Sequence, residues 1–319
     1  MTVLVLTGPK DATADLVIAE LNDRGVPVHR LDPGDFPKSL IATARISSQR
    51  GSWDGRLRGE HRDLDLGHVR SVYYRRPSEY RLHPDLSGPD AEWAAAEARV
   101  GLGGVLAALE CTWLNHPRRN AAAGVKPVAL ATAVRCGLTI PETLITNDPA
   151  EARAFISKLP SQVAAYKALG TRGPSGVDGE PYALWTTKVR ANEITDQVNL
   201  TAHQFQEWIP KAYEIRLTVV AGQMFAAKIH STSDAAQVDI RTDYDSHTYE
   251  PCDVPRSVTS GVRELLGTFG LRYAALDFLV NQQGTWHLVD VNPNGQWGFI
   301  PELRAPITRA LADLLEGTP

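Results

Sequence analysis

The stretch that decides the fold is LDFLVNQQGTWHLVDVNPNGQWG, residues 276–298. It predicts two short strands joined at a Gln283-Gly284 turn. If that turn is a tight two-residue hairpin, Asp277 lies directly opposite Asp290, a like-charge pair that normally destabilises a sheet. Asn292 projects from the same face as Asp290, because side chains alternate along a strand. The strands are otherwise apolar, so these polar groups need an explanation.

A cation explains this face better than solvent does. A solvated hairpin face is the plain alternative, but buried carboxylates are costly unless they are neutralised. Two carboxylates and an amide oxygen are hard ligands that suit Mg²⁺. Because Mg²⁺ prefers few protein ligands together with substrate phosphates, the stretch also predicts a nucleotide in the same cleft.

The composition is that of a soluble globular protein. The 319 residues are 43% hydrophobic and 22% charged, enough for two or three lobes with real cores. A formal net charge of −4 gives no basic field for nucleic acid. The start lacks a basic n-region and no window is long enough for a membrane span, so we expect a cytoplasmic protein without a membrane partner. The three cysteines are far apart, which argues against a disulfide framework or a zinc site.

The order of strand and helix patterns indicates an α/β protein. A strand at 2–8, a helix at 11–25 and a second strand form a βαβ start, although no GxGxxG follows. The first lobe, which we place at residues 1–118, continues with a hairpin at Asp54-Gly55, a strand at 69–77, a helix at 88–110 and the strand CTWLN.

The remaining patterns predict two further units around one cleft. We expect helices at 128–136, 150–158 and 257–270, strands at 138–146 and 161–169, a helix running into a strand across 194–209, and a hairpin at Ala221-Gly222.

Several residues in these units could serve a nucleotide. Lys126 begins a helix, and Lys167 interrupts an apolar strand. A Gly-rich loop follows (Gly170, Gly173, Gly176, Gly179), and such loops can close over phosphates. Glu207 and Glu214 flank a Pro-containing bend. Taken singly, the lysines can be snorkelling surface residues and the acids ordinary surface acids.

Taken together and in this order, these motifs resemble the ATP-grasp superfamily over essentially the whole chain. The final motif is the most specific, and its ending NPNGQW, with YYRRP at 73–77, is similar to the graspetide (microviridin-type) peptide maturases. The resemblance implies three lobes: a Rossmann-like pre-ATP-grasp domain at 1–118, a central domain at 119–205 and a C-terminal domain at 206–319. ATP is expected between the last two.

The resemblance also implies an activity. Such maturases use ATP and Mg²⁺ to convert Asp or Glu side chains of a ribosomal precursor peptide into acyl phosphates. They then join these to Ser or Thr hydroxyls as esters, or to Lys as amides. Many family members carry Glu where this chain has Asp290. Aspartate keeps the charge and shortens the reach by one methylene, so metal binding should survive with an altered geometry.

The resemblance assigns roles to individual residues. Lys126 and Lys167 would hold the α- and β-phosphates. Glu207, with the backbone near Trp208 and Ile209, would hold the adenine, and Glu214 would hold the ribose. The metal ligands would be Asp277, Asp290 and Asn292. Arg216, Lys228 and Arg241 would bring the substrate carboxylate to the γ-phosphate; Arg241 resembles an Asp-aromatic-Arg motif of the maturases, with Ile240 in the aromatic position.

Partners and rival functions remain open at this point. The leader of the precursor would dock as a helix on residues 185–203, and the family suggests a homodimer. Arg75 and Arg76 could serve the substrate or join the lobes. The rivals are a carboxylate–amine ligase acting on amino acids or a protein tail, an inactive peptide-binding scaffold, and an ATP-grasp kinase.

Overall fold

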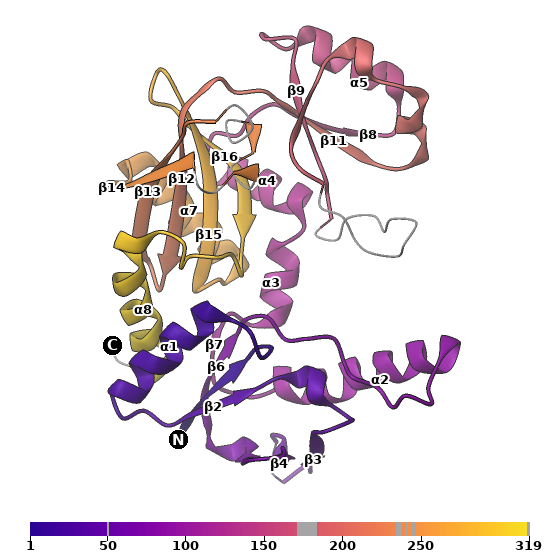
Figure 1. The fold of residues 1–319 in the computed structure, drawn as a ribbon, viewed down its shortest axis with the longest axis vertical. Helices are drawn as coiled ribbons and strands as arrows, with labels where there is room; N and C mark the ends of the chain where they lie inside the picture. The colour runs from indigo at the N-terminus through magenta and orange to yellow at the C-terminus, as the bar shows by residue number, and fades with distance from the viewer. Residues whose placement is uncertain (50, 171–183, 234–237, 240–241, 244–245, 318–319) are drawn as a thin grey trace.

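The computed structural model describes residues 1–49, 51–170, 184–233, 238–239, 242–243 and 246–317. Figure 1 shows three lobes, with α3 (Pro117–Ala123) running from the N-terminal lobe to the other two. Within the described residues the strands form four sheets, one of them a small addition to the first lobe. The expected three-lobed α/β architecture is confirmed.

The first lobe is a parallel sheet covered on both faces. Its strands lie in the order β2 (Val28–Leu31), β1 (Thr2–Leu6), β6 (Val69–Tyr74) and β7 (Thr112–Leu114). Alternate residues of β1 face opposite sides, so Val3 and Val5 pack with α1 (Ala12–Asp23), while Leu4 and Leu6 pack with α2 (Gly88–Ala107). The βαβ start is therefore as expected.

One expected hairpin in this lobe is wrong. Asp54 and Gly55 do not form a turn but begin β4 (Asp54–Arg58), which pairs with β3 (Ile41–Arg45) and β5 (Asp63–Asp65). Gly55 lies opposite Ala44, where a Cβ would approach the Thr43 carbonyl oxygen to 2.0 Å. The glycine permits close strand pairing rather than a turn.

The middle lobe is a small antiparallel sheet under one helix. The strands lie in the order β10 (Thr187–Val189), β9 (Ala164–Lys167), β11 (His203–Glu207) and β8 (Thr143–Thr146), with α5 (Pro149–Lys158) packed against them. The expected helix before β11 is wrong: the chain makes two 3₁₀ turns, η3 (Ala191–Glu193) and η4 (Asp196–Leu200). Thr195, Asp196 and Asn199 compete with helical backbone bonds, which favours turns.

The third lobe contains the largest sheet. Its order is β14 (His247–Cys252), β13 (Gln223–Ser231), β12 (Lys211–Val220), β15 (Tyr273–Asn281) and β16 (Trp286–Asn292). The predicted turn at Ala221-Gly222 is confirmed, with φ of +48° and +84°. The sequence did not indicate β14.

One helix that precedes the middle lobe in sequence packs on this third lobe instead, beside a helix that follows the middle lobe. α4 (Lys126–Arg135) and α7 (Arg256–Phe269) cover one face of the sheet, and Ala129, Ala133 and Leu276 share one core. The middle sheet, in turn, extends through Glu207. The residues that build the middle lobe therefore differ, at both ends of the range, from the central domain that we expect at 119–205.

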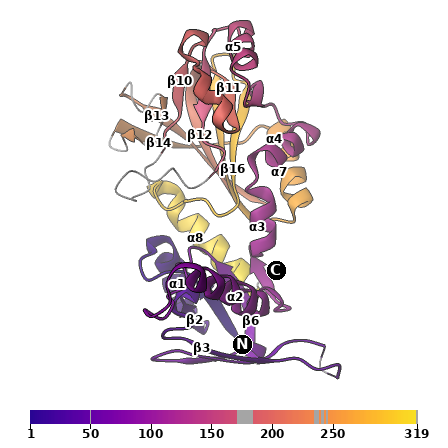
Figure 2. The same cartoon turned by 90° about the vertical axis from the view of Figure 1, so that its right-hand side faces the viewer.

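A last helix joins the first and third lobes. α8 (Pro301–Glu316) packs against α1 on one side and against β12 and β13 on the other, as Figure 2 also indicates. Its Leu311 and Leu315 are fully buried in a core that also holds Val3 and Ala227. Among the described helices, none is long and apolar enough to cross a membrane.

Candidate active site

The Asp277–Asp290 pairing is confirmed, but it arises differently from the expectation. The turn has three residues, 282–284, with Gly284 at φ +78° and Phe278 opposite Leu288. A β-bulge then adds one residue, Val289, to β16, and this brings Asp290 back opposite Asp277. The extra turn residue and the bulge cancel in the register.

The carboxylates and the amide meet on one face of the third sheet. The amide nitrogen of Asn292 lies 3.1 Å from an Asp290 oxygen and 3.4 Å from an Asp277 oxygen. Burial, reinforced by the nearby Asp290, raises the pKa of Asp277 to about 6 against the lowering effect of Arg216. The two acids thus repel each other in a poorly solvated place.

This arrangement fits a hard cation. In the described part of the chain, no group of three or more His, Cys, Asp and Glu side chains could hold a metal, so the candidate ligands are two acids and an amide. The Asn292 oxygen reaches a cation after a rotation of the amide, whose oxygen and nitrogen are alike in shape. So small a ligand set suits Mg²⁺, which keeps waters or phosphates as its other ligands.

Arg216 stands beside the two acids with donor capacity to spare. It lies opposite Asp277 on the neighbouring strand, and the two side chains form an ion pair at 3.2 Å. Its guanidinium lies 5.3 Å from the centre of the Phe299 ring. Its Nε–H is buried and has no hydrogen-bond partner among the described residues. This donor is available to an anion that enters the cleft.

Lys167 faces these groups from the middle lobe. Its Nζ donates a 2.8 Å hydrogen bond to Gln206, whose amide donates in turn to Thr143 at 3.0 Å. Burial lowers the pKa of Lys167 to about 8, while Asp290 opposes this effect and Lys126 adds to it. Lys126 donates to the Ala168 carbonyl at 3.0 Å. Lys167 therefore interacts electrostatically with Asp290, Asp277 and Lys126.

The predicted hinge residues connect β11 to β12. The Glu207 carboxylate accepts a bond from the Glu142 N–H at 3.4 Å, Trp208 lies under the Lys188 ammonium at 4.3 Å, and Ile209 is buried. Glu214 is 9% exposed, shares a strand face with Arg216, and is ion-paired with Lys211.

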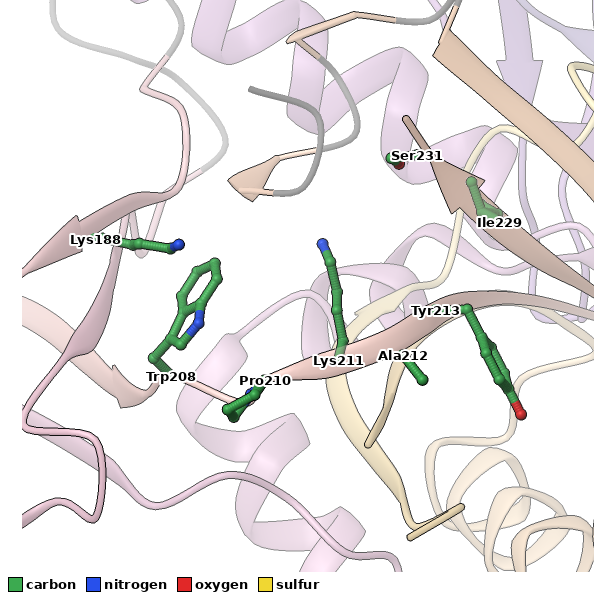
Figure 3. A pocket seen from close by; sticks show the side chains of 8 residues that line it. All are labelled: Lys188, Trp208, Pro210, Lys211, Ala212, Tyr213, Ile229 and Ser231. Carbon is green, nitrogen blue, oxygen red and sulfur yellow. The ribbon is translucent and has the colours of Figure 1, made fainter. Parts of the chain in front are cut away.

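A cavity of about 280 Å³ opens at this hinge. Figure 3 shows the Lys188 ammonium over the Trp208 ring and the Lys211 side chain extending into the same cavity beside it, with Tyr213 directed away. The lining residues are Lys188, Trp208, Pro210, Lys211, Ala212, Tyr213, Ile229 and Ser231. The cavity thus combines an aromatic wall with two cationic side chains.

Lys228 is not brought to this cluster. It lies opposite Ile215, whose side chain is in the core on the other face of the sheet from Arg216. Its Nζ pairs with Glu250 at 3.1 Å and lies 5.7 Å from the Tyr213 ring centre. The sequence-based placement beside Arg216 is therefore wrong. The Arg241 prediction, like those for Ile240, Gly173, Gly176 and Gly179, lies outside the described residues.

Sequence reasoning missed two supporting side chains. Gln206, 1% exposed, orients Lys167, and Lys211 balances the charge of Glu214. A signal for Gln206 existed: Gln204 and Gln206 alternate with Phe205 in a buried strand, which places two amides on one face.

Comparisons with known proteins show what this chain is similar to. Residues 2–121 match the family described as the MvdD pre-ATP grasp domain. One similar solved structure is a Chryseobacterium gregarium RiPP-associated ATP-grasp ligase in complex with ADP and a leader and core peptide. It is 26% identical to this chain with a TM-score of 0.90, and the match covers 100% of this chain and 97% of the ligase chain.

Two solved macrocyclases from Microcystis aeruginosa MRC are also similar. MdnC, solved with the precursor peptide MdnA, is 27% identical with a TM-score of 0.87 over 100% of both chains. MdnB is 29% identical with a TM-score of 0.80 over 98% of both chains. The search of curated proteins gave no match. These likenesses confirm the resemblance and the fold inferred from the motifs.

Proposed function

We propose that this chain, an ATP-grasp ligase with an MvdD pre-ATP-grasp domain, is a peptide macrocyclase. It would convert Asp or Glu side chains of a ribosomal precursor into acyl phosphates and join them to Ser or Thr hydroxyls or Lys amines. The observation that carries the proposal is the set of opposed charges across the cleft. Lys167, with Lys126 near it, interacts with Asp277 and Asp290, in a chain similar over its whole length to RiPP ligases.

The described residues offer a contact for each part of ATP. Lys126 and Lys167 would hold the α- and β-phosphates, because both ammonium groups lie at the same end of β9. The base would enter at the hinge beside Glu207, Trp208 and Ile209. Glu214 would accept hydrogen bonds from the ribose hydroxyls, and in this structure it is ion-paired with Lys211. Both supports for the phosphates are cations, as phosphoryl transfer requires.

Magnesium would be held by Asp277, Asp290 and Asn292. When bound, the ion supplies charge neutralisation between the phosphates and the attacking carboxylate. Asp290 reaches one methylene less far than the Glu found in many relatives, and the bulge at Val289 is the local feature that aims it.

Arg216 would align the substrate carboxylate with the γ-phosphate. Its buried, unpartnered Nε–H gives it a donor beyond its pair with Asp277. The carboxylate oxygen then bonds to phosphorus as ADP leaves. In the second step a hydroxyl or amine displaces phosphate, so each ring removes one water from the peptide. We extend this positioning role to Arg241, outside the described residues.

The precursor leader would dock on the outer edge of the middle lobe, at residues 185–203. β10 is the edge strand of that sheet, and an edge strand presents unpaired backbone groups to a partner. Leu200, which lies within the same 185–203 segment, is 81% exposed. Relatives solved with precursor peptides support a peptide partner.

The test is mass spectrometry on the precursor. A peptide encoded beside this gene is incubated with the chain, ATP and Mg²⁺, and losses of whole waters are expected. Ester rings reopen in mild base, whereas amide rings persist. Turnover of ATP with a free amino acid or small acid, and none with the peptide, would instead establish the carboxylate–amine ligase.

A homodimer is the quaternary state we propose. The exposed side chains of Trp93 (67%) and Val100 (73%) on α2 are apolar surface that a second copy can cover. Light scattering on the purified chain gives the mass. A monomer at micromolar concentration contradicts this proposal without touching the chemistry.

A further inference from the structure

Arg75 is a buried cation outside the cluster described above. It follows β6 directly, in the YYRRP motif, and is 1% exposed. A buried guanidinium is expensive unless its donors are satisfied. Its nearest acid, Asp11, lies 3.6 Å from its Nε, which has no hydrogen-bond partner in the described part of the chain. Such burial also keeps Arg75 away from any peptide, whereas Arg76 is exposed.

The other donors of Arg75 go mainly to one loop, residues 293–297. Its Nη1 donates to the Asn294 side chain at 3.0 Å and to the carbonyls of Asn294 and Gly295 at 3.2 Å each. Its Nη2 donates to Gln296 at 3.1 Å and to Thr13 at 2.9 Å. The Asn294 amide donates back to the Arg75 carbonyl. One side chain of the first lobe therefore fixes three consecutive loop residues.

That loop begins at a proposed metal ligand. The Gly295 N–H donates to the Asn292 carbonyl at 3.1 Å, which closes a tight turn on Asn292. A Cβ on Gly295 would lie 2.9 Å from the Asn292 Cβ and 2.6 Å from that of Ala275. The turn is packed directly against the strands that present Asn292 and Asp277, so displacement of the loop displaces the ligand.

Asn115 holds the same loop from a second direction. Its amide donates to the Pro293 carbonyl and the Tyr273 carbonyl, both at 2.8 Å, and its oxygen accepts from the Tyr273 N–H at 3.0 Å. The Tyr273 hydroxyl donates to the Gly295 carbonyl at 2.8 Å. Two buried polar residues of the first lobe thus grip the segment that follows Asn292.

We infer that Arg75 is a positioning residue that, with Asn115, sets the geometry of the metal site through the 293–297 loop. The inference rests on the proposed function only for the metal itself. Metal ligands must be held within about 0.5 Å, and partners one step out from the ligands commonly change metal affinity by about 10- to 100-fold. The first lobe would therefore tune a site to which it contributes no ligand.

The alternative is that Arg75 only holds two lobes together. Other contacts already do this: Arg70 donates to the Glu316 carbonyl at 2.8 Å, Ser71 to the Leu315 carbonyl at 2.7 Å, and Arg24 pairs with Asp313 at 2.6 Å. A shared apolar core lies beneath them. A buried charge is a poor choice for adhesion alone, since apolar groups serve as well.

The test compares Arg75→Lys with Arg70→Met in the full chain. Both residues come from the β6 segment and bond across lobes, but only Arg75 touches the loop. Calorimetry measures binding of AMP-PNP at increasing Mg²⁺ and also without Mg²⁺. We expect Arg75→Lys to raise the half-saturating Mg²⁺ concentration about 10- to 100-fold. Metal-free nucleotide affinity should stay within about twofold, and Arg70→Met should leave both values near wild type.

Three outcomes overturn the inference. The first is an Arg75→Lys variant that is folded, as judged by thermal melting, and keeps the wild-type Mg²⁺ response. The second is an equal shift of that response in the two variants, and the third is a wild-type chain with no Mg²⁺ response. If Arg75→Lys does not fold, Asn294→Ala removes the loop acceptor instead and should still raise the Mg²⁺ requirement several-fold. The assay contains no peptide, so failure of the macrocyclase proposal would leave its result standing.

Discussion

The third sheet and the middle sheet enclose the same cleft but are built very differently. The third has strands of up to ten residues and a core of 20 buried residues reinforced by two helices. The middle sheet has strands of three to five residues, and its core, counted like that of the third sheet over the described residues, has six. Asp277, Asp290 and Arg216 stand on the large sheet, and Lys167 stands on the small one.

This difference separates two tasks. Metal ligands need fixed geometry, and long paired strands over a deep core supply it. The residues that grip a nucleotide must also release it, and a small lobe with few buried contacts opens at lower cost. The construction of each sheet fits the role proposed for the residues that it carries.

The strongest way to break this assignment is Asp277→Asn. Loss of a metal ligand removes several kcal/mol of charge stabilisation, which corresponds to about 1000-fold or more in rate. Water loss from the precursor, followed by mass spectrometry, should therefore fall below detection. Asp253→Asn, an exposed acid in the same lobe, is the matched control. Retained cross-linking in Asp277→Asn would remove the residue from the site.

Substitution of one buried phenylalanine in each core allows the two cores to be compared. Phe278 and Phe205 are each 1% exposed, one in the large core and one in the small. Truncation to alanine removes similar contacts and costs about 3–5 kcal/mol in either place. In hydrogen exchange, Phe278→Ala should speed opening throughout the third lobe, and Phe205→Ala only in β8–β11 and α5. Global acceleration by both would show that the lobes unfold as one unit.

Lys167→Met should weaken nucleotide binding by about 10- to 100-fold, because a charge-assisted bond contributes about 1.5–3 kcal/mol. Titration with a fluorescent ADP analogue measures this. Lys158→Met, in the same lobe but on α5, is the control. Equal affinities for both variants would place the phosphates elsewhere.

Affinity for the Mg²⁺–nucleotide complex should fall about tenfold per pH unit below pH 6. Burial raises the pKa of Asp277 to about 6, so at lower pH a proton competes with the cation. The effect of pH on the folding stability of the ligand-free protein has the opposite sign. The folded pKa lies above the unfolded value, so this group stabilises the fold at low pH and that contribution is lost as pH rises through about 6. Calorimetry between pH 5 and 8 tests the prediction, and a flat profile contradicts it.

The smallest effect is expected at Lys228. Because this residue lies on the far face of the third sheet and is paired with Glu250, Lys228→Met should change cross-linking by less than about twofold. Arg216→Met, one strand away on the cleft face, should abolish it. Comparable losses in both variants would show that Lys228 reaches the cleft during turnover.

The alternation of side chains along a strand predicts the grouping of the two acids with Asn292. It also predicts that Lys228 lies on the other face of the sheet. The period of two that grouped Asp277, Asp290 and Asn292 also pairs Lys228 with Ile215 once the Ala221-Gly222 turn is known. Applied to β13, the same rule would have removed Lys228 from the cleft. The bulge at Val289 had no such signal, since an extra strand residue leaves no mark on an apolar sequence.

Other features depend on contacts between distant segments. Gly55 beside Asp54 has the sequence of a turn, and only its close approach to Thr43 places it within a strand. Arg75 could equally have been a substrate contact until the 293–297 loop was seen to enclose it. No local pattern predicts which sheet a connecting helix covers, and α4, which lies within the expected central domain at 119–205, packs on the third sheet.

The position of α8 has a consequence for the order of synthesis. The core beneath β1 is completed by Leu311 and Leu315, residues translated some 300 positions after Val3. N-terminal domains usually fold first on the ribosome, but here one face of the first sheet must wait for α8. A nascent chain would therefore expose this apolar surface until α8 has been translated. Fragments truncated before residue 301 should recruit chaperones and aggregate more than a chain that includes α8.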